Sequence, residues 1–206
     1  MSIEIKKSIK PVNYLDAITF LEKRVEKIIK RQEKELIWIL EHPSIFTAGT
    51  SYNEKDIIDK EIDIIKTSRG GKITWHGPGQ LICYLVIDLN NRKKDIRKFV
   101  NIIEKSIIES LKEIGVSSQS DRKNIGIWVK SNKEEKKIAA IGIKVKKWIA
   151  YHGFSLNIDN DLSNYKKIIP CGIRDKGVTS LKELNIYKFS NLSEIILKKL
   201  IFNLKF

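Results

Sequence analysis

The chain has 206 residues, of which 42% are hydrophobic, and its formal net charge at pH 7 is +14. This length fits one domain with a substantial core. No apolar run approaches the roughly 20 residues that span a bilayer, and the N-terminal MSIEIKKSIK lacks the apolar segment of a signal peptide. These features argue against a membrane-spanning or secreted protein, and we expect a cytoplasmic protein with no membrane partner.

Cysteine and histidine are scarce, with Cys83, Cys171, His42, His76 and His152 the only examples. Two cysteines are too few for a disulfide scaffold, and free thiols are expected in a reducing compartment. Cys83 falls within an apolar run and is expected to pack as a small hydrophobic residue. No spacing of Cys, His and Asp resembles a metal site, so we expect no metal.

The positive charge allows more than one interpretation. Clustered Lys and Arg attract phosphate, which would suit a nucleic-acid-binding protein. Here the lysines are interspersed with glutamates, as in KRVEKIIKRQEKE and NKEEKKI, and no nucleic-acid-binding motif is visible. A solvated basic surface is therefore favoured over nucleic-acid binding, and attraction to acidic protein partners remains open.

The N-terminal half begins with a predicted helix. Apolar residues recur at helical spacing from about 14 to 31, which indicates an amphipathic helix on a core. ELIWILEHP at 35–43 is typical of a strand that ends at Pro43, and the small, polar FTAGTS at 46–51 is expected to be a loop. LICYLVIDL at 81–89 opens with seven successive apolar residues and indicates a strand buried on both faces.

The C-terminal half carries a second helical stripe over residues 95–114, and Gly115 is well placed to end it. Three strand candidates follow: NIGIWVK at 124–130, KIAAIGIKV at 137–145 and WIAYHGFSLNI at 148–158. A last helix is expected from Asn191, where Glu194 resembles the second half of a capping box. The pattern predicts a single α/β domain of the α+β type over residues 1–206, with helices flanking a mixed sheet.

RGGKITWHGPGQ at 69–80 is rich in glycine and lies directly before the buried strand. Backbone without side chains can approach a ligand closely, which favours a binding loop. A tight hairpin whose glycines only satisfy a positive φ would have a similar sequence. The local sequence leaves both interpretations open.

Cys171 follows a proline and precedes a glycine in IIPCGI, a setting that suits a nucleophile whose neighbouring N–H faces an oxyanion. A structural turn is the alternative. The attacking species is the thiolate, and an unperturbed thiol has a pKa near ~8.5, so activation requires a positive or basic neighbour. Lys137 is the candidate because it opens an apolar strand, and His76 and His152 are rival bases.

Taken together, these motifs resemble the lipoyl(octanoyl) transferase family. The most specific is RGG-x-x-T-W-H-G-P-G-Q-L-x-x-Y at 69–84. Other landmarks follow the family order: LEHPSIFTAG at 40–49, GIWV at 126–129, KIAAIGIKV at 137–145, HGFSLNI at 152–158, and IPCGI followed by GVTSL. The resemblance extends over nearly the whole chain.

The resemblance implies a fold related to the catalytic domains of biotin and lipoate ligases. It implies transfer of an octanoyl (or lipoyl) group from acyl carrier protein to a lysine of a lipoyl domain, the first step of endogenous protein lipoylation. The expected partners are octanoyl-acyl carrier protein and the lipoyl domains of 2-oxoacid dehydrogenase complexes or the glycine cleavage H protein, with no nucleic acid. No cofactor is expected, since one thioester exchanges for another without ATP.

By the same resemblance, Cys171 is the nucleophile that carries the acyl group as a thioester, and Lys137 lowers the pKa of its thiol. The substrate-binding residues would be Arg69, Gly70, Gly71, Lys72, Ile73, Thr74, Trp75, His76, Ala140, Ile141, Gly142, Gly153, Phe154 and Ser155. The family often has Ser at the position of Ala140. An ATP-dependent ligase of the same fold, which needs no cysteine nucleophile, is the nearest alternative, and a basic nucleic-acid-binding module is the other.

Overall fold

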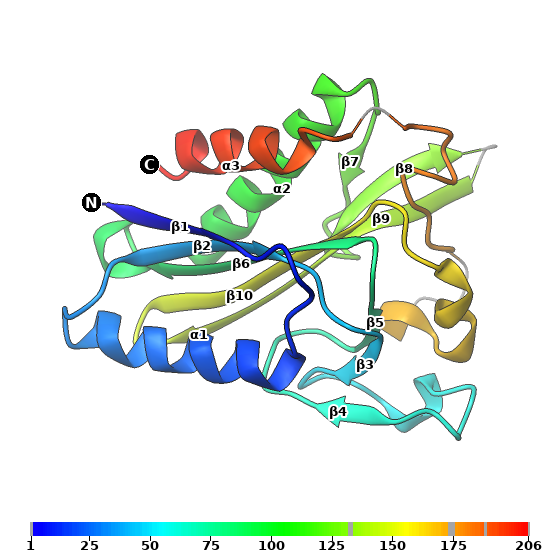
Figure 1. Cartoon of the computed structure of the whole chain (residues 1–206), viewed down its shortest axis with the longest axis horizontal. Helices are drawn as coiled ribbons and strands as arrows, with labels where there is room; N and C mark the ends of the chain where they lie inside the picture. The colour runs from blue at the N-terminus through cyan, green and yellow to red at the C-terminus, as the bar shows by residue number, and fades with distance from the viewer. Residues whose placement is uncertain (1, 132–133, 173–175, 188, 206) are drawn as a thin grey trace.

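A computed structural model describes residues 2–131, 134–172, 176–187 and 189–205, with only the backbone described at positions 131 and 171. Its main feature is a seven-stranded sheet (Figure 1). The strands, in spatial order, are β1 (Ile3–Lys7), β2 (Glu35–Leu40), β6 (Gln80–Asp88), β10 (Ile149–Asn157), β9 (Glu134–Lys146), β8 (Ile127–Ser131) and β7 (Gln119–Ser120). Strands β1 and β2 run parallel and the other neighbours run antiparallel, so the predicted mixed sheet is confirmed.

A second sheet has three short strands, in the order β4 (Ile64–Lys66), β3 (Ile45–Ala48) and β5 (Ile73–His76). The expectation that FTAGTS is entirely a loop is therefore wrong for its first half. Thr47 pairs with Ile65 on one side and with Thr74 on the other, so these small residues form the central strand. The cause is pairing with distant segments, which the local composition does not reveal.

Three α-helices flank the large sheet: α1 (Tyr14–Ile29), α2 (Ile96–Glu113) and α3 (Leu192–Asn203). Short 3₁₀ segments, η1 (Glu54–Asp56), η2 (Leu89–Asn91), η3 (Leu162–Lys167) and η4 (Pro170–Gly172), connect the larger elements. Helix α1 lies on one face of the sheet, and α2 and α3 lie together on the other (Figure 1). Within the described ranges, no helix is long and apolar enough to cross a membrane.

The helix ends agree only in part with the sequence. Gly115 follows α2 with a φ of +85°, a conformation that glycine adopts without strain, as predicted. Asn191 precedes α3, but its side chain makes no capping hydrogen bond to the described residues, so the expected capping box is not formed. Glu194 instead pairs with Lys7 on β1. A long-range ion pair therefore replaces the local contact.

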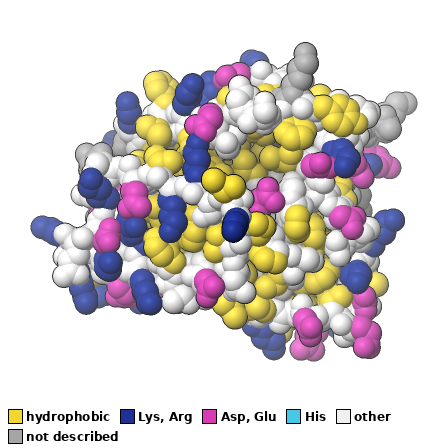
Figure 2. Space-filling model, viewed as in Figure 1, with side chains coloured by type: hydrophobic (Ala, Val, Ile, Leu, Met, Phe, Trp, Pro, Cys, Tyr) yellow, Lys and Arg dark blue, Asp and Glu magenta, His cyan; other side chains and the backbone are white. Residues whose placement is uncertain are grey.

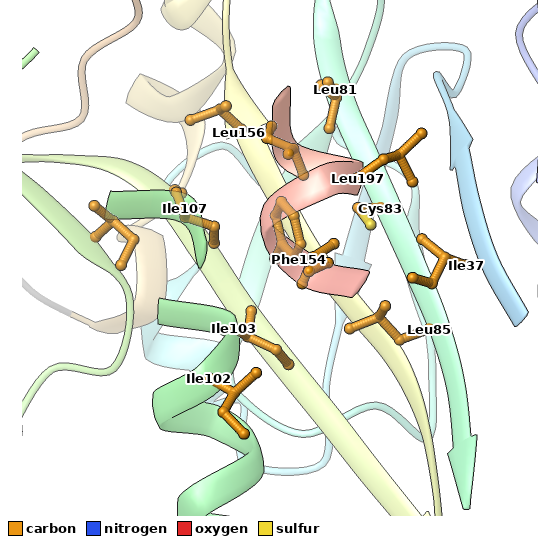
Figure 3. Close-up of a cluster of buried hydrophobic side chains, with 14 of the residues drawn as sticks. Ile37, Leu81, Cys83, Leu85, Ile102, Ile103, Ile107, Phe154, Leu156 and Leu197 are labelled. Carbon is orange, nitrogen blue, oxygen red and sulfur yellow. The ribbon is translucent and has the colours of Figure 1, made fainter. Parts of the chain in front are cut away.

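The main core lies between the large sheet and the helices α2 and α3. Leu81, Cys83 and Leu85 of β6 and Phe154 and Leu156 of β10 point into it (Figure 3). Cys83 is fully buried, and burial raises the pKa of its thiol far above the ordinary value. The prediction that it packs as a small hydrophobic residue is confirmed.

The opposite face of the same strands packs under α1. Ile82, Tyr84 and Val86 of β6 join Leu21 and Val25 of α1 in a second apolar cluster, so the prediction that β6 is buried on both faces is confirmed. Beyond α1, the small sheet covers this face (Figure 1). Side chains do not completely fill the space between the small sheet and the large sheet, and a cavity remains there.

The surface carries both signs of charge. On the face drawn in Figure 2, Lys and Arg side chains are interspersed with Asp and Glu. Several lysines are held in ion pairs, such as Lys146 with Glu26 and Lys182 with Asp159. This mixture is typical of a solvated surface.

Candidate active site

A cavity with an empty volume of about 550 Å³ lies between the large sheet and residues 69–76. All the predicted substrate-binding residues except Trp75 line it, which brings three stretches that are distant in the sequence into one place. Four other residues also line the cavity and were not predicted to bind substrate: Tyr14, Ile82, Tyr84 and His152, of which His152 was predicted only as a rival base.

Trp75 lies outside this cavity. Successive residues of a strand point to opposite faces, and in β5 the neighbours Thr74 and His76 take the cavity side. The Trp75 ring packs in a separate cluster against Tyr165, and its Nε1 donates to Ser44 Oγ at 3.0 Å. Its position supports β5 from behind.

The glycines of residues 69–71 allow close backbone contact with β9. A Cβ on Gly70 would lie 2.8 Å from the Ile143 carbonyl oxygen, and one on Gly142 would lie 3.0 Å from the Gly70 carbonyl oxygen. Real Cβ atoms rarely approach so closely. Arg69 holds this segment to β3 because its Nη2 donates to the Thr47 carbonyl and hydroxyl oxygens, each at 2.8 Å. The segment thus closes one side of the cavity with backbone.

A smaller cavity, with an empty volume of about 250 Å³, adjoins the first. Thr74, Ala140 and Ser155 line both, so the two spaces meet at these small side chains. Lys137 and Pro170 line the smaller cavity only. The candidate lysine and the residue directly before the candidate nucleophile therefore face one space.

Lys137 is buried on β9, with 5% of its surface exposed. Its ammonium Nζ donates to the Ile125 carbonyl oxygen at 3.1 Å and lies 4.7 Å from the centre of the Trp128 ring. A carbonyl dipole and an aromatic face both favour a cation. The Nζ of Lys176 also lies 4.7 Å from the centre of the Trp128 ring, but that ammonium is paired with Glu135 and Asp121.

The backbone of Cys171 lies in η4, where the Gly172 N–H donates to the Ile169 carbonyl oxygen at 2.9 Å. The Cys171 side chain lies outside the described part of the structure. A second ammonium stands beside this turn, since a Cβ on Gly172 would lie 2.3 Å from Lys72 Nζ. Two lysines from different parts of the chain therefore lie near this turn: Lys72, beside Gly172, and Lys137, which lines the same cavity as Pro170.

Hydrogen bonds fix the tautomer of His76. Asn157 Nδ2 donates to the Thr179 carbonyl oxygen at 3.0 Å, so its Oδ1 accepts from Gln80 Nε2 at 2.9 Å. Gln80 Oε1 then accepts from His76 Nδ1 at 2.7 Å, which leaves Nε2 with the lone pair. Burial, with the nearby His42 and Arg69, lowers the pKa of His76 to about 3. The ring is neutral and a weak base near pH 7.

The sequence did not single out Trp128, Tyr14, Ile82 or Tyr84 as site residues. Trp128 lies in the GIWV motif, but only the fold shows that its ring supports Lys137. His152 directly precedes the predicted Gly153, which was a local signal. Tyr14 opens α1, and nothing near it in the sequence indicates a cavity. In the described ranges, no group of three or more His, Cys, Asp and Glu residues could hold a metal ion.

Comparisons with known proteins identify the family. Residues 13–200 match the family described as the lipoyl protein ligase A/B catalytic domain. An octanoyltransferase of Wolbachia sp. subsp. Brugia malayi (strain TRS) is 45% identical over 186 residues, which cover 88% of this chain and 91% of the relative. The resemblance to lipoyl(octanoyl) transferases is confirmed.

Solved structures give the fold at much lower identity. A bi-partite lipoate protein ligase from Thermoplasma acidophilum, described together with its E2 lipoyl domain, has a TM-score of 0.72 at 14% identity and covers 99% of this chain and 84% of that chain. A biotin protein ligase from Aquifex aeolicus, in complex with biotin and ATP, has a TM-score of 0.52 at 15% identity and covers 98% of this chain and 70% of that chain. The predicted similarity in fold to lipoate and biotin ligases is confirmed. The chain belongs to the lipoyl protein ligase A/B catalytic-domain family and, within it, to the octanoyltransferases, a group of acyltransferases.

Proposed function

We propose that the chain is a single catalytic domain that acts in the cytoplasm. It transfers an octanoyl group from acyl carrier protein to a lysine of a lipoyl domain through a thioester on Cys171. The observation that carries this proposal is the pair of adjoining cavities. Lys137 and Pro170 line the smaller one, and Thr74, Ala140 and Ser155 connect it to the larger one. A reactive group and an acyl pocket would then be neighbours.

In the first step, the Cys171 thiolate attacks the carbonyl carbon of the octanoyl thioester. The bond between that carbon and the carrier sulfur breaks, and the carrier thiolate takes a proton from the Lys137 ammonium. The acyl group is now bound to Cys171 and Lys137 is neutral. A cation beside the sulfur favours the thiolate before the step, because opposite charge stabilises the ionised form.

In the second step, the acceptor lysine attacks as a neutral amine and transfers a proton to Lys137. The carbon–sulfur bond to Cys171 breaks, which restores the thiolate and the ammonium. His76 is a poorer proton acceptor than Lys137, since burial lowers its pKa to about 3. Formation of an amide from a thioester makes the transfer effectively irreversible.

The larger cavity would hold the eight-carbon chain. Each buried methylene contributes about 0.8 kcal/mol, so the chain supplies several kcal/mol of binding and its length can be discriminated. Lys72, which lines this cavity and stands beside Gly172, adds positive charge near the turn that bears the nucleophile. A positive rim would speed encounter with acidic carrier and lipoyl domains.

Intact-protein mass spectrometry tests the proposal. After the protein is mixed with octanoyl-acyl carrier protein and no ATP, we expect the mass of one octanoyl group to be added and then removed by hydroxylamine. Cys171→Ala should show no adduct and no transfer to a lipoyl domain, and Cys83→Ala is the matched control that should retain both. Full transfer by Cys171→Ala, or a strict requirement for ATP, would support the ligase instead.

A further inference from the structure

Tyr14 joins the larger cavity from an unexpected direction. Among the described residues that line this cavity, it alone belongs to helix α1, and the others come from the large sheet or from residues 69–76. Its side chain is buried, with 2% of the residue's surface exposed. Its hydroxyl donates to Thr67 Oγ1 at 3.1 Å. The polar group of Tyr14 is thus already bonded, and a chain in the cavity would meet the carbon atoms of the ring.

Two rows of paired residues on the large sheet form the floor of the cavity. The first row is Ala140, Ser155 and Ile82, and the second row is Gly142, Gly153 and Tyr84. Ala140 and Ser155 also line the smaller cavity, which contains Lys137, so the first row lies at the junction of the two spaces. The second row is therefore distal to the proposed chemistry. Rows that are two residues apart along a strand are separated by about 7 Å.

The neighbours of Tyr14 belong to the distal part of the cavity. The Tyr84 hydroxyl contacts His42 Nε2 at 2.7 Å, and the His42 ring meets the Tyr14 ring edge-on, with centroids 5.2 Å apart. The Tyr14 ring also stacks on His76, with centroids 6.1 Å apart, and His76 lies two residues beyond the junction residue Thr74 in β5. These contacts place Tyr14 away from the junction.

Helix α1 closes the space beyond the distal row. Ile149 and Tyr151 of β10 belong to the apolar cluster that contains Leu21 and Val25 of α1, and within the described ranges they do not line the cavity. The open space therefore ends where α1 begins, and Tyr14 is the first residue of that helix.

The distance to Tyr14 agrees with the length of the proposed acyl chain. With carbon–carbon bonds of about 1.5 Å in a zigzag, an octanoyl chain spans about 9 Å from its carbonyl carbon to its last carbon. A chain whose carbonyl lies at the junction would therefore end just past the distal row, beside the Tyr14 ring. Two further methylenes need about 2.5 Å more, in the space that the ring occupies.

We propose that the Tyr14 ring forms the distal end of the acyl cavity and excludes acyl chains longer than eight carbons. Tyr14 is then a specificity-determining residue, which contacts the end of the substrate chain and takes no part in the chemistry. This inference rests on the proposed function, since it assumes that the larger cavity holds the acyl chain.

The test compares octanoyl- and decanoyl-acyl carrier protein as donors, by kcat/KM for transfer to a lipoyl domain. The wild-type protein should prefer octanoyl. In Tyr14→Ala the decanoyl-to-octanoyl ratio should rise at least tenfold, because burial of each of the two additional methylenes contributes about a factor of four. A ratio that stays at the wild-type value in Tyr14→Ala, or a wild-type protein that prefers decanoyl, would overturn the proposal.

Two further variants separate the ring from its hydroxyl and from the packing of α1. Tyr14→Phe keeps the ring, so its ratio should stay within about twofold of the wild-type value. Leu21→Ala removes a buried side chain of α1 that lies outside the cavity, and its ratio should also stay near the wild-type value. Each ratio is measured on one protein sample, so a loss of folded protein cancels. A tenfold rise in either variant would contradict the role of the Tyr14 ring.

These outcomes are separable from failure of the proposed function. If octanoyl transfer by the wild-type protein is absent, the proposed function fails, and the inference fails with it. If octanoyl transfer occurs and Tyr14→Ala leaves the ratio unchanged, only the role of Tyr14 fails.

Discussion

The two faces of strands β6 and β10 differ in how completely they are packed. On the face toward α2 and α3, large side chains such as Leu85 and Phe154 fill the space. On the opposite face, Gly153 and Ser155 leave room, and a cavity remains. A pair of strands can thus support a solid core and a binding cavity at once, because alternate residues serve different faces.

The largest expected effect concerns the chemistry beside the cavity face. Lys137→Met should lower kcat/KM for octanoyl transfer about 1000-fold, equivalent to ~4 kcal/mol of barrier. It should also raise the pKa of Cys171, measured from the pH dependence of iodoacetamide alkylation. Lys176→Met is the matched control, since that lysine faces the same ring but is paired with carboxylates. Equal losses in the two variants would contradict the role of Lys137.

Substitutions on β6 compare the two faces by stability. Leu85→Ala should lower the free energy of unfolding by about 3–4 kcal/mol, because the well-packed core leaves a cavity around the missing atoms. Ile82→Ala, at the wall of the existing cavity, should cost about 2 kcal/mol. Urea unfolding measures both. A larger loss for Ile82→Ala would show that the cavity face is as tightly packed as the core.

The buried histidines make the cavity face sensitive to acid. Folding lowers the pKa of His76 and His152 from about 6.5 to about 3, so the unfolded chain binds more protons between these values. Stability is therefore complete above pH 6.5 and falls as the pH drops, by up to about 1.4 kcal/mol per pH unit for each histidine. His42, whose pKa burial also lowers, acts in the same direction.

Urea unfolding at pH 7.5, 6.5 and 5.5 measures this slope above the range in which most carboxylates titrate. His152→Asn should reduce the slope by up to about 1.4 kcal/mol per pH unit. Stability that is the same at pH 6.5 and 5.5 in the wild-type protein would mean that the histidines take up protons in the folded protein as readily as in the unfolded chain.

The smallest effect is expected at the start of α1, the helix that covers the cavity face. Asn13 Oδ1 accepts from the Leu15 N–H at 2.9 Å, and Tyr14 next to it lines the cavity. Asn13→Ala should lower the free energy of unfolding by about 1 kcal/mol. Asn13→Ser, which preserves the cap, should cost less. Thermal unfolding distinguishes the two variants.

The elements with strong local patterns were predictable, and those that depend on distant pairing were not. The apolar stripe of α1 and the continuous run of β6 identify themselves. Strand β1 is short and mixes apolar with charged residues, so it depends on its pairing with residues 35–39 of β2. Likewise, β3 is four residues long and is held by strands on both sides.

The candidate site divides in the same way. The stretch Arg69 to His76 could be selected because its sequence resembles a known family, and it lines the cavity apart from Trp75. No sequence pattern indicates that Tyr14 reaches the same cavity. The conformation of His152 is equally hidden, since its positive φ turns a residue that alternation assigns to the core toward the other face.

The burial of Cys83 simplifies any covalent labelling of this protein. The chain contains only two cysteines, and the thiol of Cys83 is fully enclosed and held protonated. A maleimide or fluorescent alkylating agent applied to the folded protein therefore reports on position 171 alone. The natural sequence already provides a single-site probe, with no need to remove a second reactive thiol.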